Sequence, residues 1–208
     1  MASATKKIAI ILGSTRTPRV APAVVAWITG LITPNLPEGT TIEVLDLADY
    51  VSLPLSPEGP LPSQYPRPLT GDPYPSEIVN KWSNQIRSYA GFIFVTPQYN
   101  WSFPAVVKVA IDNIFHEWSG KPVLIVSYGG HGGNKANSAL RQSLNGVKIH
   151  PWDGKVELPL GGAVASAANK GLLEEAVIEQ WVGAGKGKEV VERVEELTKI
   201  LSSAREKA

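Results

Sequence analysis

Short apolar runs alternate with helical stripes along the whole sequence, and this alternation restricts the fold more than any other feature. Five runs have the continuous apolar character of buried strands: Ile8–Leu12, Ile42–Leu47, Phe92–Val95, Val123–Val126 and the weaker Val156–Leu160. Helical periodicity fills the intervals, and residues 185–205 are predicted to form a closing helix. This pattern predicts an α/β fold, a doubly wound parallel sheet with helices on both faces.

The order of the strands follows from the same pattern. A five-stranded sheet of this kind has the order 2-1-3-4-5, in which the fifth strand lies at an edge. Pro159 agrees with that position, because proline lacks the N–H group that a central strand needs. The 208 residues contain no polar linker, so one domain spanning residues 1–208 is expected.

Residues 51–75 interrupt the pattern with eight prolines between Pro54 and Pro75. The segment is too long for an ordinary connection, and we expect an insertion that is either a mobile surface loop or a functional flap. Pro54-Leu55-Ser56-Pro57 matches the minimal P-x-x-P pattern of proline-rich interaction motifs. So short a motif favours a semi-rigid loop.

Charge and composition exclude several classes of function. The 20 basic and 19 acidic residues nearly cancel, which argues against a nucleic-acid partner. The chain has no cysteine, so disulfides, thiolate metal sites and thiol catalysis are excluded. His116, Glu117 and His150 lack metal-ligand spacing, and no metal is expected. Residues 1–7 carry no apolar run and no segment approaches the roughly 20 apolar residues of a membrane span, so we expect a cytoplasmic protein.

Ligands of such sheets bind beyond the carboxyl ends of the strands, where the strand order reverses. The loop after the first strand, Gly13 to Arg19, offers hydroxyls, backbone amides, a helix N-terminus and two guanidiniums, without a carboxylate. Those groups favour a phosphate dianion over the alternative, a solvated turn whose arginines point outward. The loop has neither the Lys-Ser/Thr pair of a Walker A motif nor the glycines of a dinucleotide fingerprint. A mononucleotide is the better fit, and Asp46 is interpreted as a strand-end cap.

Two further loops meet the first one at this edge. Thr96 to Pro104 is stiffened by two prolines, and it contains aromatic and amide side chains that suit a planar ring. Aromatic side chains in such a turn are equally often part of the hydrophobic core, and this loop alone leaves both interpretations open. Ser127 to Gly133 holds four glycines around His131, so its backbone can approach a ligand closely. His131 is a candidate acid–base group, although such a histidine more often only bonds its own loop.

Taken together, these loops resemble the NADPH-dependent FMN reductase family, in particular its fungal flavodoxin-like quinone reductases. The resemblance rests on Gly13-Ser14-Thr15-Arg16, Thr96 to Trp101, Pro104-Ala105, Lys108, Ala110-Ile111-Asp112, Glu117-Trp118, Gly120-Lys121-Pro122 and Ser127 to Gly133. Order and spacing agree across nearly the whole α/β core. Val109 replaces the asparagine that is common in bacterial relatives, and the proline-rich segment is longer than usual.

The resemblance implies noncovalently bound FMN, with NADPH or NADH as reductant. The FMN phosphate would contact Ser14, Arg16, Arg19 and the adjoining Val20. Its ring would contact the segment Pro97, Gln98, Tyr99, Asn100 and Trp101, and the segment Ser127, Tyr128, Gly129, Gly130, His131 and Gly132. The flavin N5 would carry the hydride, so no catalytic side chain is assigned.

The same resemblance implies a homodimer or homotetramer that reduces a small acceptor, such as a quinone, a flavin, a dye or a metal oxyanion, in a ping-pong cycle. Two other classes remain open. A non-enzymatic FMN electron carrier would usually be strongly acidic, which this chain is not. For a redox-sensing interaction module, the proline-rich segment is the only supporting feature in the sequence.

Overall fold

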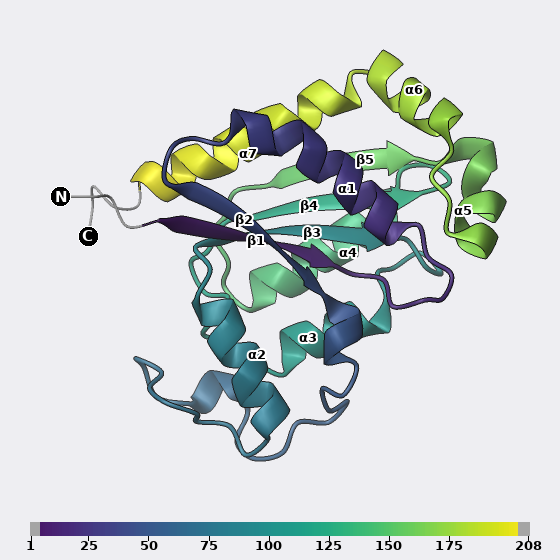
Figure 1. The fold of residues 1–208 in the computed structure, drawn as a ribbon. Helices are drawn as coiled ribbons and strands as arrows, with labels where there is room; N and C mark the ends of the chain where they lie inside the picture. The colour runs from purple at the N-terminus through teal and green to yellow at the C-terminus, as the bar shows by residue number, and fades with distance from the viewer. Residues whose placement is uncertain (1–4, 204–208) are drawn as a thin grey trace.

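The computed structural model describes residues 5–203, and a five-stranded parallel sheet forms its centre (Figure 1). The strands are β1 (Lys6–Leu12), β2 (Thr40–Asp46), β3 (Gly91–Pro97), β4 (Val123–Gly129) and β5 (Gly154–Pro159). Their order is β2-β1-β3-β4-β5, and every neighbouring pair is parallel. The predicted fold class and strand order are confirmed, and β5 with Pro159 lies at an edge.

Helices cover both faces of the sheet, as Figure 1 shows. On one face lie α1 (Ala21–Ile32), α6 (Glu175–Gly183) and α7 (Lys186–Ser203). On the other lie α2 (Glu77–Arg87), α3 (Ala105–Asp112) and α4 (Asn134–Gly146). Short 3₁₀ turns occupy Thr33–Asn35, Leu47–Tyr50, Pro62–Gln64 and Gly161–Ala163.

Most helices begin where the sequence indicates. Pro22 lies in the first turn of α1, where its missing N–H costs no hydrogen bond, and Pro104 is the N-cap of α3. The closing helix begins at Lys186 and is described to Ser203, so positions 204–205 of the predicted range lie outside the described residues. Two helices were not predicted from the sequence: α6, and the short α5 (Val164–Lys170).

The proline-rich segment 51–75 is irregular apart from its 3₁₀ turn, and it lies along the α2 side of the molecule (Figure 1). Specific hydrogen bonds hold it there. The Tyr74 hydroxyl donates to the buried Glu117 carboxylate at 2.9 Å, and the Asn113 amide donates to the carbonyl oxygen of Pro54 at 2.9 Å. These two hydrogen bonds anchor the segment near both of its ends.

The sheet register brings three loops to one edge. Leu12 of β1 is paired with Val95 of β3, and Thr96 is paired with Ser127 of β4. The three strands therefore end at nearly the same level, and the chain that follows each of them leaves the sheet there. Within residues 5–203, no helix is both long and apolar enough to cross a bilayer.

Candidate functional site

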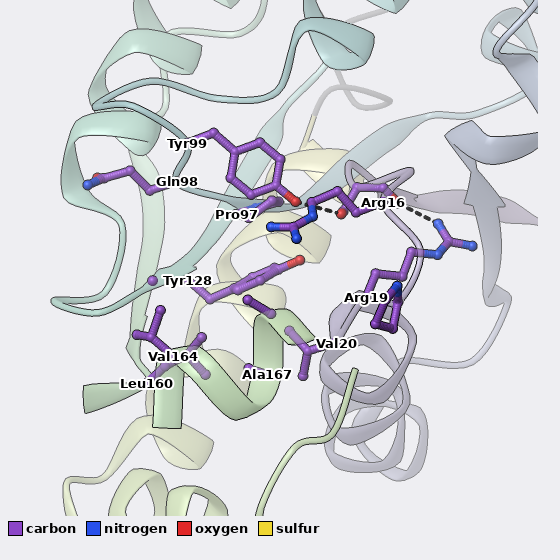
Figure 2. A pocket seen from close by; sticks show the side chains of 14 residues that line it. Arg16, Arg19, Val20, Pro97, Gln98, Tyr99, Tyr128, Leu160, Val164 and Ala167 are labelled. Atoms are coloured by element: carbon purple, nitrogen blue, oxygen red, sulfur yellow. Dashed lines mark hydrogen bonds between the residues drawn. The ribbon is translucent and has the colours of Figure 1, made fainter. Parts of the chain in front are cut away.

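A pocket lies at this carboxyl edge (Figure 2). Four segments line it: the loop between β1 and α1, the end of β3 with the turn that follows, the end of β4, and the chain after β5. The lining residues are Ser14, Arg16, Pro18, Arg19, Val20, Pro97, Gln98, Tyr99, Tyr128, Gly129, Leu160, Val164, Ala167 and Ala168. The set contains no carboxylate, and Arg16 contributes a guanidinium, so it suits an anionic ligand.

Gly13 explains why the first loop can leave β1 so close to its neighbours. A Cβ atom at this position would lie 2.9 Å from Val107 Cγ2 and 3.1 Å from the carbonyl oxygen of Val95. Only glycine fits between β3 and α3 at that point. The next residue, Ser14, is buried, and its Oγ lies 3.0 Å from the Tyr99 hydroxyl. This hydrogen bond joins the first loop to the second.

The two arginines of the first loop differ in what they contact. Arg16 is exposed, and no hydrogen bond or ion pair joins it to another residue within 5–203. Figure 2 shows it reaching into the pocket beside the hydroxyls of Tyr99 and Tyr128. The guanidinium of Arg19 points away from them, toward Asp46.

Arg19 and Asp46 form a bidentate ion pair. Arg19 Nη1 and Nη2 lie 2.8 Å and 2.5 Å from the two carboxylate oxygens of Asp46. The hydrogen bond with Asp46 raises the pKa of Arg19. Burial alone would raise the pKa of Asp46, but the hydrogen bonds from Arg19 and the Ala48 N–H lower it below its usual value. Asp46 accepts the Ala48 N–H at 2.9 Å, which confirms the predicted strand-end cap.

The N-terminus of α1 adds to the positive character of the loop. Its N-cap, Val20, makes no side-chain cap, and its first turn contains no acidic residue. Within residues 5–203, no N–H group of residues 14–17 donates to a backbone carbonyl oxygen. Free amides, a helix N-terminus and an unpaired guanidinium together make an anion site.

The second loop divides between pocket and surface. Pro97, Gln98 and Tyr99 line the pocket, and Gln98 Oε1 also accepts the N–H groups of Lys135 at 3.0 Å and of Ala136 at 3.3 Å at the start of α4. Asn100 and Trp101 form the tip of a turn outside the pocket lining, and Trp101 is 72% exposed.

The third loop contributes Tyr128 and Gly129 to the lining. Burial raises the pKa of the Tyr128 hydroxyl, so this group stays protonated and can donate a hydrogen bond. The remaining predicted residues of this loop, Ser127, Gly130, His131 and Gly132, do not line the pocket. The buried Ser127 hydroxyl instead donates to the carbonyl oxygen of Gly132 at 2.9 Å, which fixes the shape of the glycine loop.

Sequence reasoning missed the fourth wall of the pocket. Leu160 follows β5, and Val164, Ala167 and Ala168 come from α5, which Figure 2 shows beside the pocket. The small residues of α5 carry no helical stripe of apolar side chains, so periodicity did not find it. A topological signal was present, because β5 also ends at the carboxyl edge.

The pocket lies at the switch point of a doubly wound sheet, which is where α/β proteins of this class bind mononucleotides. Comparison with known proteins identifies the family. The family of NADPH-dependent FMN reductases matches residues 6–163. An NAD(P)H-dependent FMN reductase of a Nectria species is 38% identical over 205 residues, which cover 96% of this chain and 99% of that protein. The chain belongs to the NADPH-dependent FMN reductase family.

Two more distant comparisons agree with this assignment. A quinone reductase of Pseudomonas putida is 38% identical over 108 residues, which cover 49% of this chain and 58% of that protein. The solved structure of an oxidoreductase from Corynebacterium diphtheriae superposes with a TM-score of 0.60 at 15% identity, covering 97% of this chain and 99% of that one. That likeness shows the shared fold.

Family membership confirms the predicted FMN-dependent, NAD(P)H-consuming oxidoreductase. The residues present fit the cofactor. The first loop has a free guanidinium, a hydroxyl and unpaired amides for a phosphate monoester, and Tyr99 and Tyr128 provide aromatic surface beside it. Within residues 5–203, no group of three or more His, Asp or Glu side chains is arranged to hold a metal ion.

Proposed function

We propose that this protein oxidises NAD(P)H and reduces small acceptors such as quinones with FMN held in the pocket at the carboxyl edge. The observation that carries the proposal is Arg16, which lies with Ser14 in a pocket lined by no carboxylate and has no ion-pair partner among residues 5–203. A phosphate monoester would supply a negative charge to pair with the Arg16 guanidinium. The family assignment supplies the reaction class.

The residues divide the work by their position. Ser14, Arg16 and the N-terminus of α1 would hold the phosphate, and Tyr99 and Tyr128 would flank the rest of the cofactor. Val20 would border the phosphate as the N-cap of α1, and Arg19 belongs to the same loop with its guanidinium turned to Asp46. The predicted ring contacts from Asn100, Trp101, Ser127, Gly130, His131 and Gly132 stay proposals, supported by their place in the two segments that border the pocket.

Bound FMN supplies hydride transfer from the nicotinamide to the acceptor. The chain therefore needs to bind and orient the rings and to exclude water, and it needs no nucleophile. The Tyr128 hydroxyl, which burial keeps protonated, is a hydrogen-bond donor at the pocket wall. The apolar wall formed by Leu160, Val164 and Ala167 would keep water from that side.

Several finer statements belong to the same proposal. The acceptor is a quinone, flavin, dye or oxyanion, and the relatedness to a quinone reductase favours the first. The chain acts as one FMN-binding domain in the cytoplasm, where NAD(P)H is available. It forms a homodimer or homotetramer, which is supported by the exposed apolar side chains of Trp101, Val164 and Leu172 in the segments around the pocket.

The direct test is flavin binding by an Arg16→Ala variant. Removing a charge-assisted contact to the phosphate is expected to weaken FMN binding by about ten- to a hundredfold. Titration of the flavin-free protein with FMN, followed by flavin fluorescence, measures the affinity. Arg67→Ala is the matched control, because Arg67 is also exposed but lies in the proline-rich segment. Equal affinity of the Arg16→Ala variant and the wild type would contradict the phosphate assignment.

A further inference from the structure

The Arg19 guanidinium makes three hydrogen bonds, one within the first loop and two to the end of β2. Its Nη1 donates to the carbonyl oxygen of Ser14 and to Asp46 Oδ1, while its Nη2 donates to Asp46 Oδ2. The guanidinium thereby joins the start of the loop to the carboxyl end of β2. The pair is well shielded, with 20% of the Arg19 side chain and 26% of the Asp46 side chain exposed.

The backbone of Arg19 is held as well. Gly171, which follows α5, has a φ of 67°, and a Cβ atom there would lie 3.0 Å from the carbonyl oxygen of Arg19 and 3.1 Å from its nitrogen. The chain after α5 thus packs directly on the end of the loop. The loop is fixed at Ser14 through Arg19, at Arg19 through Gly171, and at the Ser14 hydroxyl through Tyr99.

Charge distinguishes the roles of the two arginines. Arg16 is unpaired in the pocket, whereas the charge of Arg19 is neutralised by a bidentate carboxylate. A bidentate Arg–carboxylate pair has fixed geometry and is stronger than an ordinary ion pair. Arg19 would lose both of these hydrogen bonds if it turned to a phosphate.

We propose that Arg19 and Asp46 form a brace that positions the phosphate-binding loop, so that Asp46 strengthens FMN binding without touching the cofactor. This inference rests on the proposed function. The brace keeps the Ser14 hydroxyl, the unpaired loop amides and the base of Arg16 in one arrangement. A binding site that is ordered in advance loses less entropy when the ligand binds.

The direction in which FMN affinity changes when Asp46 is removed separates this proposal from a purely electrostatic role of Asp46. Asp46 is an anion close to the proposed anion site. If Arg19 were a phosphate ligand, removing Asp46 would free its guanidinium and strengthen phosphate binding. The brace predicts the opposite, because without Asp46 the loop is held less firmly. The positioning residues are therefore tested through Asp46.

The experiment uses Asp46→Ser, Arg19→Met and the double variant, each titrated with FMN and with riboflavin. Serine can still cap the Ala48 N–H but cannot reach Arg19, and methionine keeps the aliphatic bulk of Arg19. Asp112→Ser is the matched control, because Asp112 is bound to Lys108 on the exposed side of α3. Thermal unfolding checks that every variant remains folded.

We expect each single variant to bind FMN about tenfold more weakly, the double variant to be no worse than either by more than about twofold, and riboflavin affinity to stay unchanged. Unchanged or tighter FMN binding by Asp46→Ser, or additive losses in the double variant, would overturn the brace. An equal loss for both flavins would also overturn it, because the effect would not involve the phosphate. A wild-type protein without any preference for FMN over riboflavin would instead refute the phosphate site, and the brace with it.

Discussion

Trp101 occupies a backbone conformation that glycine usually takes. Asn100 and Trp101 have φ values of 47° and 67°, and the N–H groups of Tyr99 and Ser102 each donate to the carbonyl oxygen of the other at 2.8 Å and 2.9 Å. Positive φ at both central residues is the pattern of a type I′ turn, for which Asn-Gly is the preferred pair. Lys135 Nζ lies 5.2 Å from the centre of the Trp101 ring, which partly offsets the cost of the turn.

Trp101→Gly is therefore expected to be more stable than Trp101→Ala by about 1 kcal/mol. Both variants lose the ring and its contact with Lys135, so their difference isolates the backbone term. Urea unfolding of the two variants measures it. If alanine is tolerated as well as glycine, the left-handed conformation at this turn carries no cost.

At the scale of elements, Lys121 connects α2 to the sheet. Its Nζ donates to the carbonyl oxygen of Ile86 at 2.8 Å in the last turn of α2, and it lies 5.4 Å from the centre of the Phe92 ring in β3. A cation at this end of a helix interacts favourably with the helix dipole. Burial nevertheless lowers the pKa of Lys121 to about 8, although the nearby Glu117 acts in the opposite direction.

This depressed pKa predicts stability that rises with pH. Between pH 8 and 10 the folded protein has released the Lys121 proton, while the unfolded chain, with an ordinary lysine pKa of about 10.4, still holds it. Raising the pH therefore favours the folded state, by up to about 1.4 kcal/mol per pH unit. Above this window the trend reverses, because burial raises the pKa of Tyr89 to about 12 and the unfolded chain loses its tyrosine protons first.

Urea unfolding at a series of pH values between 7.5 and 10, on the wild type and on Lys121→Met, measures this effect. The methionine variant should lose this rise in the free energy of unfolding. A wild-type stability that falls steadily across this range would contradict the lowered pKa of Lys121.

The whole molecule concentrates its chemistry at one edge of the sheet. Four chain segments, at the carboxyl ends of β1, β3, β4 and β5, meet in one pocket, and α5 closes it on one side (Figure 2). If the cofactor fills the pocket as proposed, the nicotinamide and the acceptor have to approach its ring from the same open side. They then bind in turn.

Initial rates with NAD(P)H and a small quinone are accordingly expected to give parallel double-reciprocal lines. His131→Ala should lower the rate by less than about tenfold, because His131 is exposed outside the pocket lining and hydride transfer needs no protein acid. Intersecting lines would show that both substrates bind together. If the FMN-loaded protein consumes no NAD(P)H with any quinone, flavin or dye, the electron-carrier alternative is correct.

The sequence by itself determined the features that depend on local pattern. Continuous apolar runs are required for strands that are buried on both faces, so Phe92–Val95 and Val123–Val126 identified the centre of the sheet, and Pro159 identified its edge. The strand order then predicted the carboxyl edge as the ligand site. Residue chemistry in the first loop predicted an anion there, and Ser14 and Arg16 do line the pocket.

Only the tertiary structure decided how the loop residues divide between pocket, brace and surface. Arg16 and Arg19 lie in the same loop, and their contacts differ because β2 ends with Asp46 beside Arg19. Gly130, His131 and Gly132 belong to the same glycine-rich loop as Gly129, yet they do not line the pocket. The wall formed by α5 was not predicted because its alanines show no amphipathic stripe. The contact of Gly171 with the first loop joins segments about 150 residues apart, which no local pattern indicates.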